Sequence, residues 1–190
     1  MLPPGHLGVA YLLYSLYAHV RFRRPPRPEP VLAVVVGSQF ADIIDKPLWW
    51  LGVLSSGRAL AHSLLFAAVL VIVVYTAARA LDRVETATAF VLAHQSHLLA
   101  DLPPRALLGY PHATEYLFWP FLPPSTFAFE TRVFEPPTPV ELVVTPFTDS
   151  FTLFLLEFLL LGFALVVWYT DGCPGLQYIR TVEHNFRKRE

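Results

Sequence analysis

Residues 34–50 read VVVGSQFADIIDKPLWW and carry Asp42 and Asp45 inside an apolar stretch. A carboxylate within a lipid bilayer costs at least about 2.5 kcal/mol on insertion scales, so an ionisable residue there indicates a functional site. Residues three apart lie on one face of a helix, and we expect the two aspartates to point the same way. This stretch therefore predicts a helix that presents a pair of carboxylates to a bound group.

Two further apolar stretches carry candidate metal ligands. His62 lies in RALAHSLLFAAVLVIVV, residues 58–74. His97 and Asp101 lie in VLAHQSHLLADL, residues 91–102, four apart and hence on one predicted helical face. With a histidine at the start of the first apolar run, the candidate metal ligands are His6, Asp42, Asp45, His62, His97 and Asp101.

The composition points to a membrane protein. Of the 190 residues, 54% are hydrophobic and 15% are charged, whereas soluble domains average about 25% charged residues. The net charge of -1 argues against a nucleic-acid partner, which would need a basic face. The single cysteine, Cys173, allows no intramolecular disulfide. We predict an all-α fold, a polytopic membrane helical bundle that forms one membrane-embedded domain over residues 1–190.

About five stretches meet or approach the roughly 20 apolar residues that a membrane-spanning helix needs. They are residues 6–20, 31–54, 59–78, 86–102 and 151–170. Five spans place ten of the fourteen basic residues on one side of the membrane, and basic residues stay cytoplasmic. We therefore expect a protein integral to the cell (plasma) membrane, with its N-terminus outside and its tail, residues 171–190, in the cytoplasm.

This topology places all six candidate ligands in the outer half of the bilayer, which favours a single shared site. Residues 103–149 follow the fourth predicted span on the outer side and hold ten of the eighteen prolines. Proline removes amide donors and breaks helices. We therefore expect an irregular, Pro-rich outer cap with about one helical turn, lying at the level of the lipid headgroups.

The candidate residues fit a divalent metal centre. Histidine and aspartate together suit Zn, Mn or Fe better than Mg or Ca. A tetrahedral catalytic site takes three protein ligands and a water, so six candidates indicate either two ions or one ion with some residues outside its ligand sphere. We assign catalytic roles to Asp45, as a carboxylate that moves protons, and to Arg58, whose guanidinium suits a phosphoryl or carboxylate charge. The alternative for the two aspartates of residues 34–50 is a structural ion pair with Lys46 or Arg58.

These residues favour a metal-dependent hydrolase. A bound metal lowers the pKa of water to near 7 and so supplies a nucleophile. Because the predicted site lies at the outer leaflet, the expected partner is a membrane lipid or another amphipathic substrate, of a lipid or phosphoester type. Two alternatives stay open, an ion- or proton-coupled transporter and a non-catalytic membrane module with a structural metal. The oligomeric state is open as well.

Four ordered motifs follow His6, namely GSQFAD, GRALAHS, SHLLAD and WPF. They resemble the pattern of the membrane-bound metal-dependent hydrolases, the LexA-binding, inner membrane-associated hydrolase family. That pattern has an early His, then Gly-Ser-x-x-Pro-Asp-x-Asp, His-Arg-x-x-Thr-His-Ser, Ser-His-x-x-x-Asp and Trp-Pro-Phe. The matching residues are His6, Gly37, Ser38, Asp42, Arg58, His62, Ser63, Ser96, His97, Asp101, Trp119, Pro120 and Phe121. The resemblance implies a multi-span helical membrane protein with a metal-dependent hydrolase site.

The sequence departs from the family pattern at three positions. Ala41 stands in place of the motif proline, and Asp45 comes one residue later than the second aspartate of the pattern. Gly57 replaces the first histidine of the third motif, which implies the loss of one ligand and leaves the binding of a second metal and the activity open. The DIIDKP variant resembles a haloarchaeal branch of the family.

Overall fold

The computed structural model describes residues 2–102, 114–123 and 150–178, and every regular element in these ranges is helical. The all-α prediction is therefore confirmed for the described residues. The elements are α1 (Pro3–Phe22), α2 (Pro28–Gly37), α3 (Phe40–Trp50), α4 (Leu64–Ala80), α5 (Val84–Ala100), the short 3-10 helix η1 (Glu115–Phe118) and α9 (Ser150–Thr170).

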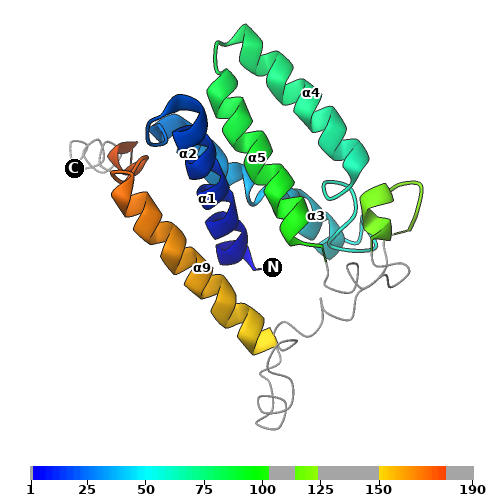
Figure 1. Ribbon diagram of the computed structural model, residues 1–190. Helices are drawn as coiled ribbons and strands as arrows, with labels where there is room; N and C mark the ends of the chain where they lie inside the picture. The colour runs from blue at the N-terminus through cyan, green and yellow to red at the C-terminus, as the bar shows by residue number, and fades with distance from the viewer. Residues whose placement is uncertain (1, 103–113, 124–149, 179–190) are drawn as a thin grey trace, which may run out of the picture.

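The helices run back and forth between two ends of the molecule (Figure 1). Helix α5 lies at the centre and packs against α1, α2 and α4, while α9 packs along α1. We call the end where α1 and α4 begin and where α3 and α5 finish the Asp42 end. The opposite end, which carries Arg24, Arg27, Arg79 and Arg83, is the arginine end.

Small side chains let the central helices approach closely. The core between α1, α2 and α5 contains buried Ala10, Ala89 and Ala93 beside Tyr14 and Val34. Glycine is required at one contact, because a Cβ at position 37 would lie 2.6 Å from the Phe90 carbonyl oxygen of α5. The close approach of α2 and α5 therefore fixes where α3 starts, and α3 carries Asp42.

The second apolar stretch does not form one helix over residues 31–54. It divides into α2 and α3, with a break at Ser38 and Gln39. Polar side chains hold this break, since the Gln39 amide donates to Ser38 Oγ at 3.1 Å and to the Pro3 carbonyl oxygen of α1 at 3.1 Å. The break brings a backbone carbonyl into the Asp42 end, where the candidate site lies.

The third apolar stretch also differs from its predicted helix over residues 59–78. Residues 51–63 form a series of turns and bends, and α4 begins only at Leu64. Ser63 caps the helix by accepting a hydrogen bond from the Phe66 amide at 3.1 Å. His62 consequently lies in a loop rather than in the first turn of a helix, and its position depends on contacts to other elements.

The arginine end is held by ion pairs between helices. Arg24 donates two hydrogen bonds to Glu85 at 2.7 and 2.8 Å, and Tyr14 donates to the same carboxylate at 3.2 Å. Arg83 pairs with Glu29 of α2. These contacts join the α1–α2 connection and the start of α2 to the region where α5 begins.

Among the residues described, no helix has both the length and the apolar character that crossing a membrane demands. The five-span topology therefore stays a prediction.

Parts of the predicted outer cap and tail lie outside the described residues. Of residues 103–149 the structure describes residues 114–123, which contain the single 3-10 turn η1 and the exposed side chain of Phe121. Of the predicted tail it describes residues 171–178.

Candidate metal centre

Four candidate side chains converge at the Asp42 end. Each of them offers one ligand atom, and these atoms lie within 4.8 Å of one another, with all four residues buried. The four-ligand group, as we call it, consists of Asp42, His62, His97 and Asp101. Its members come from α3, from the loop before α4, and from the last turn and C-cap of α5.

The spacing of the four-ligand group suits one tetrahedral ion. The closest nitrogens, Nε2 of His62 and Nε2 of His97, are 3.2 Å apart. Asp42 Oδ1 lies 3.7 and 3.8 Å from these two nitrogens, and Asp101 Oδ2 lies 3.5 Å from His62 Nε2. Metal–ligand bonds of about 2.0–2.2 Å in tetrahedral geometry place ligand atoms about 3.3–3.6 Å apart. The residues present therefore fit a divalent metal.

Asp45 fixes the orientation of His62. Its carboxylate accepts the Nδ1–H of His62 at 2.8 Å and the backbone N–H groups of Ala59, Ala61 and His62 at 2.9, 2.8 and 3.2 Å. A carboxylate can only accept here, so Nδ1 carries a proton, and in the neutral ring the Nε2 lone pair faces the other ligands. Such a carboxylate–histidine pair is the usual support of a metal-binding imidazole.

The break between α2 and α3 fixes the orientation of His97. The Ser38 carbonyl oxygen accepts the Nδ1–H of His97 at 2.7 Å. A carbonyl cannot donate, so His97 also carries its proton on Nδ1 and presents a lone pair from Nε2. Both imidazoles thus point an unprotonated nitrogen at the same point, where only a cation or a proton can satisfy them together.

Both carboxylates of the four-ligand group contact a cationic side chain. Lys46 Nζ lies 2.6 Å from Asp42 Oδ2, and Arg58 Nε lies 2.9 Å from Asp101 Oδ2. His6 contacts the second oxygen of Asp101 at 3.1 Å, and its ring stacks on that of His97 with centroids 3.9 Å apart. Each carboxylate therefore contacts a positive charge, and Asp101 is held through both of its oxygens.

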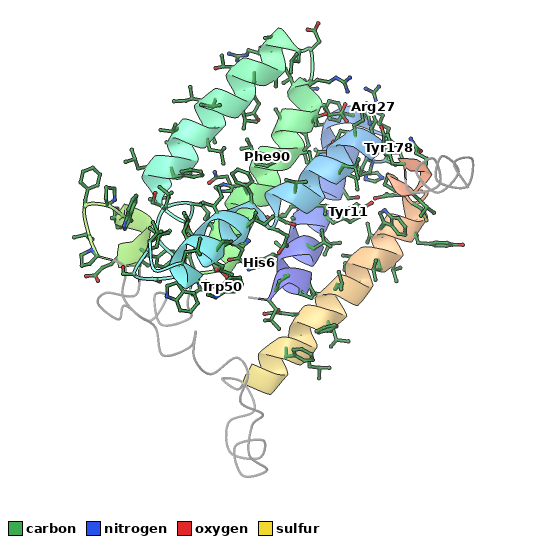
Figure 2. The ribbon with its side chains drawn as sticks, turned by 180° about the vertical axis from the view of Figure 1, so that it is seen from behind. His6, Tyr11, Arg27, Trp50, Phe90 and Tyr178 are labelled. Carbon is green, nitrogen blue, oxygen red and sulfur yellow. The ribbon has the colours of Figure 1, made fainter. Side chains whose placement is uncertain are left out.

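The structure brings all six sequence-predicted ligands to one end of the bundle. Four form the four-ligand group, while His6 and Asp45 adjoin it through Asp101 and His62. Arg58, predicted as a catalytic residue, contacts Asp101. Figure 2 shows His6 and Trp50 at this end, with Arg27 and Tyr178 at the opposite end.

Two contributors to the site were not identified from the sequence. The Ser38 carbonyl is a backbone group, and no side-chain pattern signals where a backbone acceptor will be needed. Tyr116 of η1 makes a T-shaped ring contact with His62 and donates from its hydroxyl to the Asp101 carbonyl oxygen at 3.4 Å. Tyr116 lies in a Pro-rich segment with many aromatic residues, and nothing in the sequence distinguished it from the other aromatic residues there.

Other buried ionisable residues lie outside the four-ligand group. His94 packs between Phe40 and Phe90. Glu157 of α9 accepts the Leu2 amide at 2.7 Å and so ties the start of α1 to α9. Asp171 accepts hydrogen bonds from the hydroxyls of Tyr11 and Ser15 at the arginine end, both at 2.7 Å. Asp171 offers a buried carboxylate remote from the site, useful as a control.

Comparison with known proteins identifies the family. The model of the family described as YdjM inner membrane protein matches residues 1–172. No curated protein matches the chain, and no solved structure matches it. The match agrees with the membrane family that the motifs resemble, whereas LexA binding and a haloarchaeal origin stay predictions.

Proposed function

Because the chain belongs to the YdjM inner membrane protein family, we propose that it is an integral membrane hydrolase that uses a divalent metal held by the four-ligand group. The observation that carries this proposal is the pair of Nε2 atoms, from His62 and His97, that face each other at 3.2 Å. Each ring has its Nδ1–H committed to a fixed acceptor. Two lone pairs at that distance repel each other unless a cation or a proton lies between them, and the carboxylates of Asp42 and Asp101 beside them favour a metal cation.

The proposed metal is a single Zn, Mn or Fe ion, because imidazole and carboxylate together favour these ions. Such an ion supplies Lewis-acid activation of water and of a substrate oxygen. The chain's own residues orient the ligands, exclude bulk water through their burial, and provide charge for the substrate. Arg58 is proposed to contact a substrate anion, since its guanidinium lies against a ligand carboxylate.

Asp45 is proposed as a positioning residue. Both of its oxygens accept hydrogen bonds, from three backbone amides and from His62. The same contacts hold residues 59–62 as a loop, so Asp45 acts on the metal through His62. His6 is proposed to hold Asp101 in a comparable way.

We propose that the Asp42 end faces the outside and that the arginine end is cytoplasmic, following the distribution of basic residues. The outer surfaces of α4 and α9 support a bilayer location, because they expose large apolar side chains such as Ile72, Val73, Leu159 and Phe163. A lipid or phosphoester substrate in the outer leaflet would then reach the site without leaving the membrane.

Labelling of single cysteines tests this orientation. In a Cys173→Ser background, Trp50→Cys and Arg79→Cys each place a thiol at an exposed position at one of the two ends. A maleimide that cannot cross membranes should label position 50 in intact cells and position 79 only after permeabilisation. The reverse pattern would contradict the proposed orientation.

Metal analysis of the purified protein tests the site. The wild-type protein should bind about one ion per chain and hydrolyse a phosphoester or lipid ester. The substitutions Asp42→Asn and His97→Gln should abolish both properties, while His19→Gln, at the arginine end, should preserve them. A protein without tightly bound metal would favour a transporter, and bound metal without turnover of any ester would favour a structural metal.

A further inference from the structure

We infer that Lys46 and Arg58 form an anion-binding pair that makes the site specific for phosphoesters, with Lys46 as a specificity-determining residue. This inference rests on the proposed metal-dependent hydrolase. It adds a substrate class and a second cationic contact to that function. The evidence is the placement of the two cations relative to the ligand carboxylates.

Each cation contacts a different carboxylate of the four-ligand group. Asp42 turns Oδ1 toward the two histidines and Oδ2 toward Lys46, whose Nζ lies 2.6 Å away. Arg58 approaches Asp101 through Nε at 2.9 Å, which uses one of the five N–H donors of its guanidinium. The two cations therefore flank the metal position from α3 and from the loop before α4.

The two cationic side chains are more exposed than the carboxylates that they contact. Lys46 is 39% exposed and Arg58 is 15% exposed, whereas the carboxylates that they contact are 10% and 3% exposed. A buried structural ion pair would have both partners enclosed. Lys46 instead combines a partly exposed side chain with a direct contact to a buried ligand carboxylate, so a polar substrate group can approach the lysine from outside.

The charge balance of these groups favours an anion. With neutral histidines, a divalent ion and the carboxylates of Asp42 and Asp101 cancel, so Asp45, Lys46 and Arg58 leave one net positive charge. A phosphoester brings negative oxygens that match this charge and accept hydrogen bonds from ammonium and guanidinium groups. A neutral carboxyl ester has no charge to match, and its carbonyl oxygen accepts weaker hydrogen bonds than an anionic oxygen does, so the pair discriminates between the two ester classes.

The phosphoester has two possible sources, a lipid headgroup or a soluble molecule. Exposed apolar side chains at the Asp42 end include Trp50 at 73%, Leu51 at 76% and Phe121 at 79%. They lie at the end of α3, directly after it and next to η1, and α3 also carries Lys46. A phosphoryl group attached to an apolar chain would match both the cations and these side chains.

Phosphate binding tests the inference without requiring turnover. The probe is inorganic phosphate added to the metal-loaded protein in detergent, measured by calorimetry and by the shift in Tm. Lys46→Gln should weaken phosphate binding by about tenfold, as expected for the loss of one charge-assisted hydrogen bond. Lys46→Arg should retain most of the affinity. Arg79→Gln, which removes an exposed charge at the arginine end, should leave it unchanged, and Lys46→Met provides a second neutral variant.

Substrate comparison gives a second readout. The wild-type protein should hydrolyse p-nitrophenyl phosphate in preference to p-nitrophenyl acetate, and Lys46→Gln should raise KM for the phosphate ester by about tenfold with a smaller effect on the acetate. Vesicles that contain phosphatidic acid, compared with soluble glycerol 3-phosphate, distinguish a lipid source from a free one.

Several results would overturn the inference. If the protein binds metal but Lys46→Gln and Lys46→Met bind phosphate as the wild type does, Lys46 is a structural ion-pair partner. Faster turnover of carboxyl esters than of phosphoesters would also refute the inference while leaving a metal-dependent hydrolase intact. Absence of bound metal would instead remove the proposed function and the inference together.

Discussion

Replacing Asp45 with asparagine removes the support of His62 while preserving size and shape. The carboxylate accepts four hydrogen bonds, from the Ala59, Ala61 and His62 amides and from the His62 ring. Asparagine has one acceptor oxygen, so its NH₂ group must face at least one of these donors. The arrangement that loses least turns the NH₂ group toward the Ala61 amide, which Oδ1 accepts at 2.8 Å.

The magnitude follows from these four contacts. An unsatisfied buried donor costs about 1–3 kcal/mol, and the other three hydrogen bonds each weaken by about 1 kcal/mol when the acceptor loses its charge. We expect Asp45→Asn to lower the free energy of unfolding by about 4–6 kcal/mol. Since loss of such a support usually weakens metal binding by about 10–100-fold, metal affinity should fall by a similar factor.

Thermal unfolding in detergent and a metal titration measure the two effects. Asp171→Asn is the matched control, because Asp171 is a buried carboxylate that accepts hydrogen bonds from Tyr11 and Ser15 at the opposite end. The control should lower Tm and leave metal affinity unchanged. Wild-type metal affinity in Asp45→Asn, or an equal loss of metal in the control, would refute this account of Asp45.

Further predictions concern packing, metal removal and the arginine end. Gly37→Ala places a Cβ 2.6 Å from the Phe90 carbonyl oxygen and should lower the free energy of unfolding by about 1–3 kcal/mol. The control Gly162→Ala, where a Cβ would have no atom within 4 Å, should not lower Tm. An equal loss of stability in the two variants would contradict the close contact at position 37. Chelation should lower Tm, and added Zn, Mn or Fe should restore it. At a free metal concentration a hundredfold above Kd, the bound ion should raise the free energy of unfolding by about 2.7 kcal/mol. A Tm that does not change when the chelator is added would argue against a bound ion. Metal affinity in titrations should fall as pH decreases, because protons compete for both imidazole nitrogens, and a flat profile would speak against histidine ligands. Glu85→Gln should lower Tm by weakening two hydrogen bonds from Arg24, and a loss of bound metal in this variant would show that the two ends are not independent.

The sequence was sufficient to predict that Asp42, His62, His97 and Asp101 lie close enough together to share a metal ion. Ionisable side chains in apolar stretches are rare, and the alternation of helix direction placed His6, Asp42 and Asp101 at the same end. The structure confirms that a buried group of two aspartates and two histidines can hold a metal ion. Two physical effects supported this prediction, the helical spacing of the ligand pairs and the free-energy cost of burying a charge. Both can be judged from a single sequence.

The different roles of the two aspartates within the site could not be predicted in the same way. Asp42 and Asp45 are equivalent in sequence, both being carboxylates on one face of a short apolar helix. Their roles separate because Asp45 binds the amides of residues 59–62, a loop that the hydrophobic pattern assigned to a helix. The hydrophobic pattern of residues 59–78 does not reveal that the Asp45 carboxylate will accept the hydrogen bonds of the amides in residues 59–62, because that contact is made only in the tertiary structure.

The interruption between α2 and α3 has a consequence for any attempt to transplant this centre. A straight helix over residues 34–50 would engage the Ser38 carbonyl in its own ladder, and the His97 ring would then lack the acceptor that holds its proton on Nδ1. Grafting the two aspartates and two histidines onto an idealised bundle would thus reproduce the ligands but not their protonation pattern. A transplanted centre would also have to include the break between α2 and α3 at Ser38 and Gln39.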